Sequence, residues 1–241
     1  LRSWQSDAMN AWNANNQRGV IEAATGTGKT MVAFAAIAEQ HRKHGDRLRV
    51  AIVVPTMQLA RQWRDGLSQH LFLPRHLIGE QHSTADVNWT PDHPILVTVI
   101  NTARTQLKKV TSQWAREGAS TLLIVDECHR AGAESNARIF ESSFNATIGL
   151  SATPDRDDDG DTTHVYPNLG RPVFSYPLLR ALDDEVLAPL CSVNLYVDFT
   201  PEEQSRWDAT AEALTNAMRS LRWEHPDLDF DSADIFARIG R

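Results

Sequence analysis

Residues 23–30 (AATGTGKT) have the residue types and spacing of a loop that binds the phosphates of a nucleotide. The two glycines carry no Cβ, so the backbone can approach an anion and turn its N–H groups toward it. The lysine would reach the β- and γ-phosphates, and the last threonine hydroxyl could hold Mg²⁺. An alanine stands in the place of the first glycine of this pattern. The expected nucleotide-binding residues are Thr25, Gly26, Thr27, Gly28, Lys29 and Thr30.

Asp126 and Glu127 are the second group that could do chemistry, because they follow an apolar run, TLLIV at 121–125. Asp126 would bind Mg²⁺ through water, and Glu127 would orient and deprotonate a water that attacks the terminal phosphate. The alternative is a solvated acid pair at the start of a helix. The phosphate loop earlier in the chain favours the first interpretation, in which Lys29, Asp126 and Glu127 form the catalytic set.

The elements that must position these residues are strands alternating with helices as far as residue 154. Apolar runs predict strands at 19–24, 48–54, 95–100, 121–125 and 146–150, with a short one at 76–78. Helices are expected at 4–16, 31–38, 57–68 and 103–110. Continuous apolar strands indicate a mostly parallel, doubly wound sheet in an α/β fold. Ligands bind such sheets beyond the carboxyl ends of the strands, where the polar motifs fall.

The pattern changes after residue 154. Residues 155–164 are acidic, residues 189–199 alternate like an edge strand, and residues 201–222 predict a long helix with proline at its start. The helix carries an apolar stripe at Trp207, Ala211, Leu214, Met218 and Leu221. We therefore expect a connector with a strand and a long helix after the α/β domain.

Composition and charge limit the function classes. Apolar residues make up 41% of the 241 residues, which excludes global disorder, and no apolar run is long enough for a membrane span. The first ten residues show no secretory signal, and two cysteines cannot form a disulfide framework, so we expect a cytoplasmic protein without a membrane partner. The first 110 residues hold 13 Lys and Arg against 8 Asp and Glu, whereas the remainder holds 11 against 23. A polyanion-facing half is one explanation, and uneven surface charge without function is the other.

Four motifs in this order resemble the first motor domain of a superfamily 2 helicase or translocase, which has a RecA-like fold. They are ATGTGKT at 24–30, VVPT at 53–56, DECH at 126–129 and SATP at 151–154. DECH is a variant of the family's DEAH box, with Cys128 in the alanine place. LRSWQ at 1–5 is similar to the start of the family's Q-motif. Residues 150–160 resemble the group that holds DNA-repair helicases and the motor subunits of type I and type III restriction enzymes.

The resemblance implies further roles. Gln5 would read the adenine edge with Arg2 nearby, and Ser151 and Thr153 would couple hydrolysis to domain movement, with His129 in hydrogen-bond range. The nucleic-acid strand would run along Pro55, Thr56, Gln62, Thr98, Asn101 and Thr102. Three of these also have an ordinary interpretation, because Thr56, Asn101 and Thr102 could simply cap helices. The tryptophans could stack on bases, although we expect most of them in the core or at its rim.

The activity that the resemblance implies is ATP hydrolysis with Mg²⁺, driving movement along nucleic acid, DNA in preference to RNA. A RecA-like ATP-binding domain is expected at 1–175, and a connector or the start of a second motor domain at 176–241. The family's second domain supplies arginines to the ATP site, so we expect it in a longer protein, with a nuclease or specificity subunit as a further partner. The alternatives are a double-strand translocase that does not separate strands and an ATP-binding scaffold without motor activity.

Overall fold

The computed structural model describes the chain except for residues 83–87, 91, 154–158, 190–194 and 225–241. The chain divides into two compact units, Leu1–Pro189 and Leu190–Arg241, which are described separately. The expected domain boundary after residue 175 stays a prediction.

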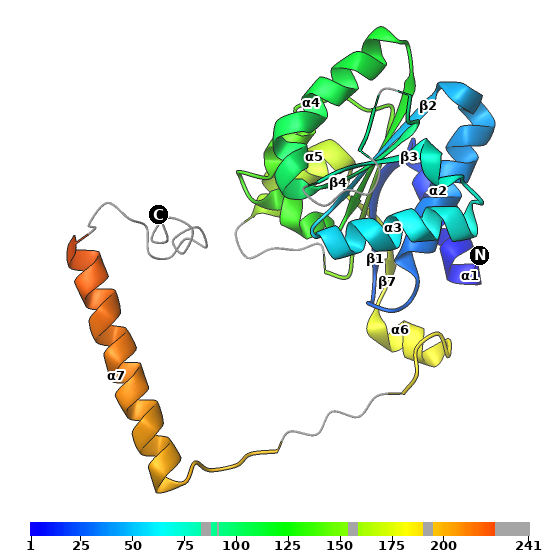
Figure 1. Cartoon of the computed structure of the whole chain (residues 1–241). Coiled ribbons are helices and arrows are strands. Elements are labelled where there is room, and N and C mark those ends of the chain that lie inside the picture. Colours follow the sequence, from blue (N-terminus) through cyan, green and yellow to red (C-terminus); the bar gives the residue numbers. More distant parts are fainter. Residues whose placement is uncertain (83–87, 91, 154–158, 190–194, 225–241) are drawn as a thin grey trace. The chain divides into compact units, whose positions relative to one another are not determined.

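The first unit is built on a seven-stranded sheet with the order β3-β4-β2-β5-β6-β1-β7, and all of its strand pairs are parallel (Figure 1). The apolar runs of the sequence form its inner strands, which are buried almost throughout because helices cover both faces. The predicted doubly wound α/β fold is therefore confirmed. The strands are β1 Arg18–Ala23, β2 Leu48–Val54, β3 Ile78–Gln81, β4 Ile95–Val99, β5 Ser120–Asp126, β6 Ala146–Ser151 and β7 Pro172–Tyr176.

Two hydrophobic clusters cover the two faces of the sheet. One contains Trp12, Phe34 and Trp63 from α1 (Ser3–Ala14), α2 (Lys29–His44) and α3 (Met57–His70). The other contains Leu107 and Trp114 from α4 (Ile100–Arg116) and residues of shorter helices. These are the 3₁₀ helices Cys128–Gly132 and Ala137–Phe140, the π-helix Asp161–Val165 and α5 (Tyr166–Leu169).

Some element boundaries differ from the sequence expectation. Residues 75–77 form a 3₁₀ turn, and the strand expected at 76–78 is instead Ile78–Gln81. The last strand of the sheet, β7, was not expected. It pairs with β1, and Tyr176 at its end is buried with Ala181 of α6 (Leu178–Asp183) in the first core cluster.

The second unit contains the helix α7 (Pro201–Glu224), which confirms the expected long helix. The expected strand at 189–199 is not confirmed. Residues 195–199 pair with no strand among the described residues, and residues 190–194 lie outside them. In the part of the chain that the structure describes, none of the helices has the length and apolar character needed to cross a membrane.

Candidate active site and nucleic-acid interface

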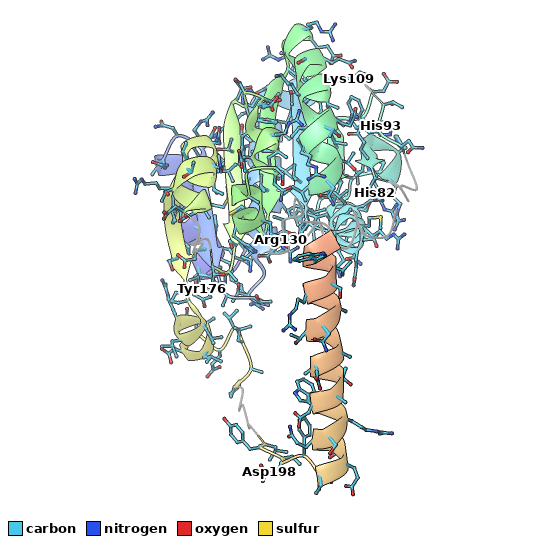
Figure 2. The ribbon with its side chains drawn as sticks, turned by 90° about the vertical axis from the view of Figure 1, so that its left-hand side faces the viewer. His82, His93, Lys109, Arg130, Tyr176 and Asp198 are labelled. Carbon is cyan, nitrogen blue, oxygen red and sulfur yellow. The ribbon has the colours of Figure 1, made fainter. Side chains whose placement is uncertain are left out.

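Three motifs meet at one edge of the sheet because β5, β6 and β1 are neighbours and run in the same direction. The phosphate loop follows β1, Asp126 ends β5 and Ser151 ends β6. In Figure 2, Arg130 (just beyond the end of β5) and Tyr176 (the end of β7) lie toward this edge of the first unit, and Lys109 of α4 lies toward the opposite edge. The fold therefore brings together residues that are far apart in the sequence, such as Lys29 and Ser151.

The phosphate loop has the backbone that its glycines allow. Gly26 and Gly28 have φ angles of 84° and 95°, a region that side chains other than glycine rarely adopt. The Thr27 hydroxyl donates to the carbonyl of Ala24 at 2.6 Å, which closes the loop on itself. Thr25 and Gly26 are exposed at the tip, where a phosphate could approach.

Lys29 begins α2, and its ammonium group is withdrawn from water. Its Nζ donates to the carbonyl of Ala23 at 2.9 Å. Burial lowers the pKa of Lys29, and the nearby carboxylates of Glu127 and Asp126 oppose that shift. An ammonium group has three N–H donors, so Lys29 can keep this bond and still bind phosphate oxygens.

The Asp126 carboxylate is held through both of its oxygens. Oδ1 accepts the backbone N–H of Glu127 at 3.0 Å, and Oδ2 accepts the indole N–H of Trp63 at 2.8 Å. Burial raises the pKa of Asp126, and the hydrogen bond from Trp63 opposes that shift. Glu127 has a left-handed backbone, with φ 46° and ψ 52°, which is unusual for a residue other than glycine. Such strain is found at functional sites, where the surrounding structure imposes it.

His129 connects the DECH segment to the end of β6. Its Nδ1 lies 3.0 Å from the Ser151 hydroxyl and 3.6 Å from Oε2 of Glu127. The Ser151 hydroxyl also accepts the backbone N–H of Thr153 at 3.2 Å. The hydrogen bond expected between His129 and the SATP motif is therefore present, and the coupling role of these residues stays a prediction.

The N-terminal segment reaches the phosphate loop through Gln5. Its Nε2 donates to the carbonyl of Gly28 at 3.2 Å, and its Oε1 accepts the backbone N–H of Arg2 at 2.8 Å. An amide group has a second N–H and a second lone pair, so adenine recognition by Gln5 stays a prediction that these bonds allow. Trp4 is buried and stacks on Tyr176 with ring centroids 4.6 Å apart, so it is a core residue.

Five of the six residues expected along a nucleic-acid strand, all but Thr98, lie after β2 and β4, which are neighbouring strands. Thr56 caps α3, because its hydroxyl accepts the backbone N–H of Leu59 at 3.3 Å, and Pro55 is half-buried before it. Gln62 is exposed on α3. Asn101 and Thr102 lie in the first turn of α4, and neither makes its N-terminal cap.

Thr98 differs from the others. It is fully buried, and its hydroxyl donates to the carbonyl of Gln81 at 3.0 Å. The side chain of Thr98 is therefore not presented to a strand, because it bonds β4 to β3 inside the sheet. Its burial leaves Thr98 outside the proposed nucleic-acid contacts.

Trp63 is the site residue that the motifs did not indicate. It was expected as a core or rim tryptophan, yet its indole N–H bonds the Asp126 carboxylate. Its position directly after Gln62, on the helix that follows VVPT, was the available signal. A cavity of about 490 Å³ between α2 and α3 is lined by Trp63 together with Thr30, Gln62 and Asp126.

The donor set fits a nucleotide phosphate with Mg²⁺. Thr30 and Asp126 supply the hard oxygen ligands that Mg²⁺ prefers, and both line the same cavity. Lys29 and the N-terminus of α2 supply positive charge for phosphate. Among the described residues, no group of three or more His, Cys, Asp and Glu side chains forms a metal-binding cluster of its own.

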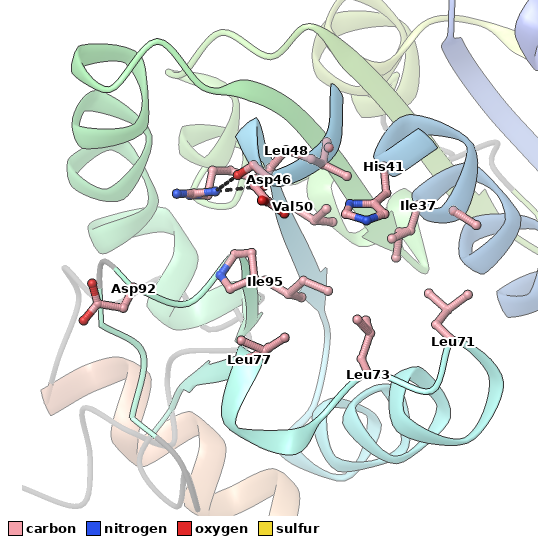
Figure 3. Close-up of a pocket in the computed structure, with 14 residues that line it drawn as sticks. Ile37, His41, Asp46, Leu48, Val50, Leu71, Leu73, Leu77, Asp92 and Ile95 are labelled. Carbon is pink, nitrogen blue, oxygen red and sulfur yellow. Dashed lines mark hydrogen bonds between the residues drawn. The ribbon is translucent and has the colours of Figure 1, made fainter. Parts of the chain in front are cut away.

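A second cavity, of about 480 Å³, lies at the amino ends of β2 and β4 (Figure 3). Its wall is mostly apolar and includes Leu48, Val50, Leu73 and Ile95, and His41 points into it from the end of α2. It lies at the opposite ends of these strands from the motifs, so it is separate from the candidate active site.

Comparison with known proteins gives a family match and two informative relatives. A family model described as "Type III restriction enzyme, res subunit" matches residues 1–156. The protein "DNA 3'-5' translocase XPB2" of Sulfurisphaera tokodaii is 29% identical over 232 residues, which are 95% of this chain and 47% of that protein. The "Type I restriction enzyme EcoAI endonuclease subunit" of Escherichia coli is 27% identical over 205 residues, which are 82% of this chain and 24% of that protein. This chain thus spans less than half the length of either relative.

Among solved structures, the helicase domain of Hef from Pyrococcus furiosus is similar in fold. The TM-score is 0.55 at 22% identity, and the match covers 73% of this chain and 37% of that chain. The likeness supports the RecA-like arrangement of strands and flanking helices described above.

Proposed function

The chain belongs to the family of type III restriction enzyme res subunits, and we propose that it is the first motor domain of an ATP-dependent helicase or translocase that moves along DNA. One observation carries this proposal. The phosphate loop, the Asp126–Glu127 pair and Ser151 stand at the same edge of three neighbouring strands, where a nucleotide would meet all of them.

In the proposed reaction, the phosphate loop and Lys29 bind ATP, and Thr30 and Asp126 hold Mg²⁺. When bound, Mg²⁺ would neutralise charge on the phosphates. Glu127 orients the attacking water and takes its proton, and its side chain is 30% exposed, so water can reach it. Gln5, with Arg2 nearby, reads the adenine edge.

We assign coupling to Ser151, Thr153 and His129. The hydrogen bonds among them link His129, two residues after the proposed base Glu127, to the end of β6. A change at the γ-phosphate would alter these bonds, and the segment after Ser151 would transmit that change to a second domain.

We place the nucleic-acid strand over the N-termini of α3 and α4, at Pro55, Thr56, Gln62, Asn101 and Thr102. The two helices follow neighbouring strands, so both positive helix ends face the same edge of the sheet. Backbone N–H groups and hydroxyls there suit phosphate contacts, which hold a strand without reading its sequence. The names of the two relatives, a DNA translocase and a restriction endonuclease subunit, favour DNA.

We further propose that the longer protein carries a second motor domain after this one and works with a nuclease or specificity subunit. The similarity to a restriction enzyme subunit supports the latter. The cytoplasm as its compartment also stays a prediction, supported by the low cysteine content.

The proposed function is tested by measuring the rate of ATP hydrolysis by the full-length protein without DNA, with duplex DNA and with single-stranded DNA. DNA should stimulate turnover severalfold or more, whereas an ATP-binding scaffold would show little turnover under any of these conditions. A strand-displacement assay on the same protein then separates a helicase from a translocase that leaves the duplex intact.

A further inference from the structure

The Asp126 carboxylate is oriented by a residue from a different strand–helix unit. Asp126 ends β5, whereas Trp63 lies on α3, which follows the neighbouring strand β2. The indole N–H of Trp63 donates to Oδ2 at 2.8 Å, and the backbone N–H of Glu127 donates to Oδ1 at 3.0 Å. With both oxygens bonded, rotation of the carboxylate would break at least one bond to a buried partner.

The indole ring is itself held in place. Trp63 is 2% exposed, and the ring of Phe34 packs against it edge-on, with centroids 5.4 Å apart and planes at 81°. A Cβ at Gly66, one turn after Trp63, would lie 2.7 Å from Cζ of Phe34, so the two helices are in close contact here. Phe34 belongs to α2, which begins at Lys29. The Trp63 ring on α3 is therefore held by its packing against α2, the helix that follows the phosphate loop.

The chemistry of the indole suits a positioning role. Indole is a neutral donor without an acceptor, so it cannot take the place of Asp126 as a metal ligand. A carboxylate oxygen accepts two hydrogen bonds or ligands, so Oδ2 can keep the indole and still face the nucleotide. Partners that orient metal-binding side chains in this way typically contribute 10- to 100-fold to metal affinity.

We propose that Trp63 is a positioning residue that holds the Asp126 carboxylate in the orientation needed for Mg²⁺, and so links α3 to the metal site. The proposal rests on the proposed function, in which Asp126 holds Mg²⁺ and α3 contacts DNA through Thr56 and Gln62. Gln62, Trp63, Thr30 and Asp126 line one cavity, so a shift of α3 on DNA would reach the metal site through one hydrogen bond.

The test is Trp63→Phe, which keeps an aromatic ring against Phe34 and removes the N–H donor. The matched control is Trp12→Phe. The Trp12 indole is equally buried and donates to the carbonyl of Thr147 at 2.9 Å, near the start of β6 and away from Asp126. Both variants lose one buried indole hydrogen bond, so losses of stability should be similar.

The readout is equilibrium binding of a fluorescent ADP analogue to the 241-residue chain at a series of Mg²⁺ concentrations and in EDTA. For Trp63→Phe we expect the Mg²⁺ concentration at half-maximal binding to rise about 10-fold. Affinity in EDTA should stay within about 2-fold of wild type, because the phosphate loop is intact. Trp12→Phe should match wild type in both measurements.

Equal Mg²⁺ dependence in the two variants would overturn the proposal and leave Trp63 a core residue. Failure of the proposed function would give a different result, because the wild-type chain would then bind no nucleotide. That result would overturn the proposed role of Trp63 as well. If Trp63→Phe does not fold, the proposal is tested by NMR on the indole N–H signals of the ¹⁵N-labelled wild-type protein. Mn²⁺ with ADP should strongly broaden one indole signal, and the absence of any broadened indole signal would overturn the proposal.

Discussion

At the residue scale, Lys29 and Asp126 are charged groups that the fold withdraws from water. Burial is the largest cause of both pKa shifts, lowering that of Lys29 and raising that of Asp126. Each shift means that the charged form is less favourable in the folded protein than in water. A bound phosphate would place negative charge beside Lys29, and Mg²⁺ would place positive charge beside Asp126. Each ligand would therefore stabilise the charged form of the residue that binds it.

The first prediction separates binding from hydrolysis. Lys29→Ala removes a charge-assisted bond to phosphate, so nucleotide affinity should fall about 10- to 100-fold. Glu127→Gln leaves Lys29 and Asp126 in place, so ATP should still bind while turnover falls about 100-fold or more. Nucleotide affinity and turnover are measured together for both variants. Equal loss of binding in the two variants would contradict the assigned roles.

A second prediction concerns Cys128, the residue that departs from the usual DEAH pattern. Its thiol is buried against β6, where a Cβ at Gly149 would lie 3.0 Å from its Sγ. Burial, reinforced by Glu127 and Asp126, raises the pKa of the thiol far above its usual range. We expect Cys128 to resist iodoacetamide in the native protein at pH 8 and to react in guanidinium chloride, as followed by peptide mass spectrometry. Equal rates in the two conditions would show that the thiol is accessible.

At the element scale, the contact between α2 and α3 joins the phosphate loop to the proposed DNA-contacting helix. Gly66→Ala tests it, because the added Cβ would lie 2.7 Å from the Phe34 ring. Alanine improves helix propensity by about 1 kcal/mol, whereas overpacking a core costs about 1–3 kcal/mol. The ring is also packed on Trp63 and His70, so we expect a net loss of about 1 kcal/mol in the free energy of unfolding.

Urea denaturation of Gly66→Ala measures this loss, with Gln69→Ala as the control on the exposed face of the same helix. The control should change stability by less than about 0.5 kcal/mol. A stabilised Gly66→Ala protein would mean that α2 and α3 are not in close contact at this point.

The sequence predicted an element well where the local residue pattern alone determines its type and its ends. β2 was expected at 48–54 and is found there, because its apolar run is bounded by charged residues and Pro55. α4 was expected at 103–110 but spans Ile100–Arg116. The prediction was too short because polar residues in the outer turns interrupt the apolar pattern. β7 was missed because its half-exposed residues follow no buried pattern, and pairing with β1 alone makes it a strand.

The candidate site was predictable where motifs are contiguous and not where contacts cross between elements. The phosphate loop and the Asp126–Glu127 pair were recognisable from spacing. The bond from Trp63 to Asp126 joins residues 63 positions apart and depends on β2 lying beside β5, which no local pattern gives. Burial of Thr98 likewise depends on its pairing strand, because its hydroxyl bonds the carbonyl of Gln81 on β3.

At the scale of the whole molecule, the second unit presents apolar surface. Trp207 and Leu214 on α7 are each more than 60% exposed, so the second unit by itself does not bury them. The relative from Sulfurisphaera tokodaii is about twice as long as this chain. We propose that α7 packs against the second motor domain of a longer protein, and docking of the same stripe on the first unit is the alternative.

A further prediction at this scale follows from charge. The positive excess lies within the first 110 residues, so lysine and arginine side chains there should add ionic DNA contacts that are insensitive to sequence. Affinity for duplex DNA should fall about 10-fold or more between 50 and 200 mM salt, because binding releases counterions. Fluorescence anisotropy with two unrelated sequences measures this. A salt-independent affinity, or a strong preference for one sequence, would contradict the proposed phosphate contacts.

The central claim is that this chain holds one side of an ATP site that a second domain completes. The most direct test compares ATP turnover by the 241-residue chain with turnover by the full-length protein, each with saturating single-stranded and duplex DNA. Opposing arginines contribute about 10³ to 10⁵ in rate in related NTPases, so the chain alone should hydrolyse ATP at least about 10³-fold more slowly while still binding it. Turnover by the chain that matched the full-length rate would contradict the claim.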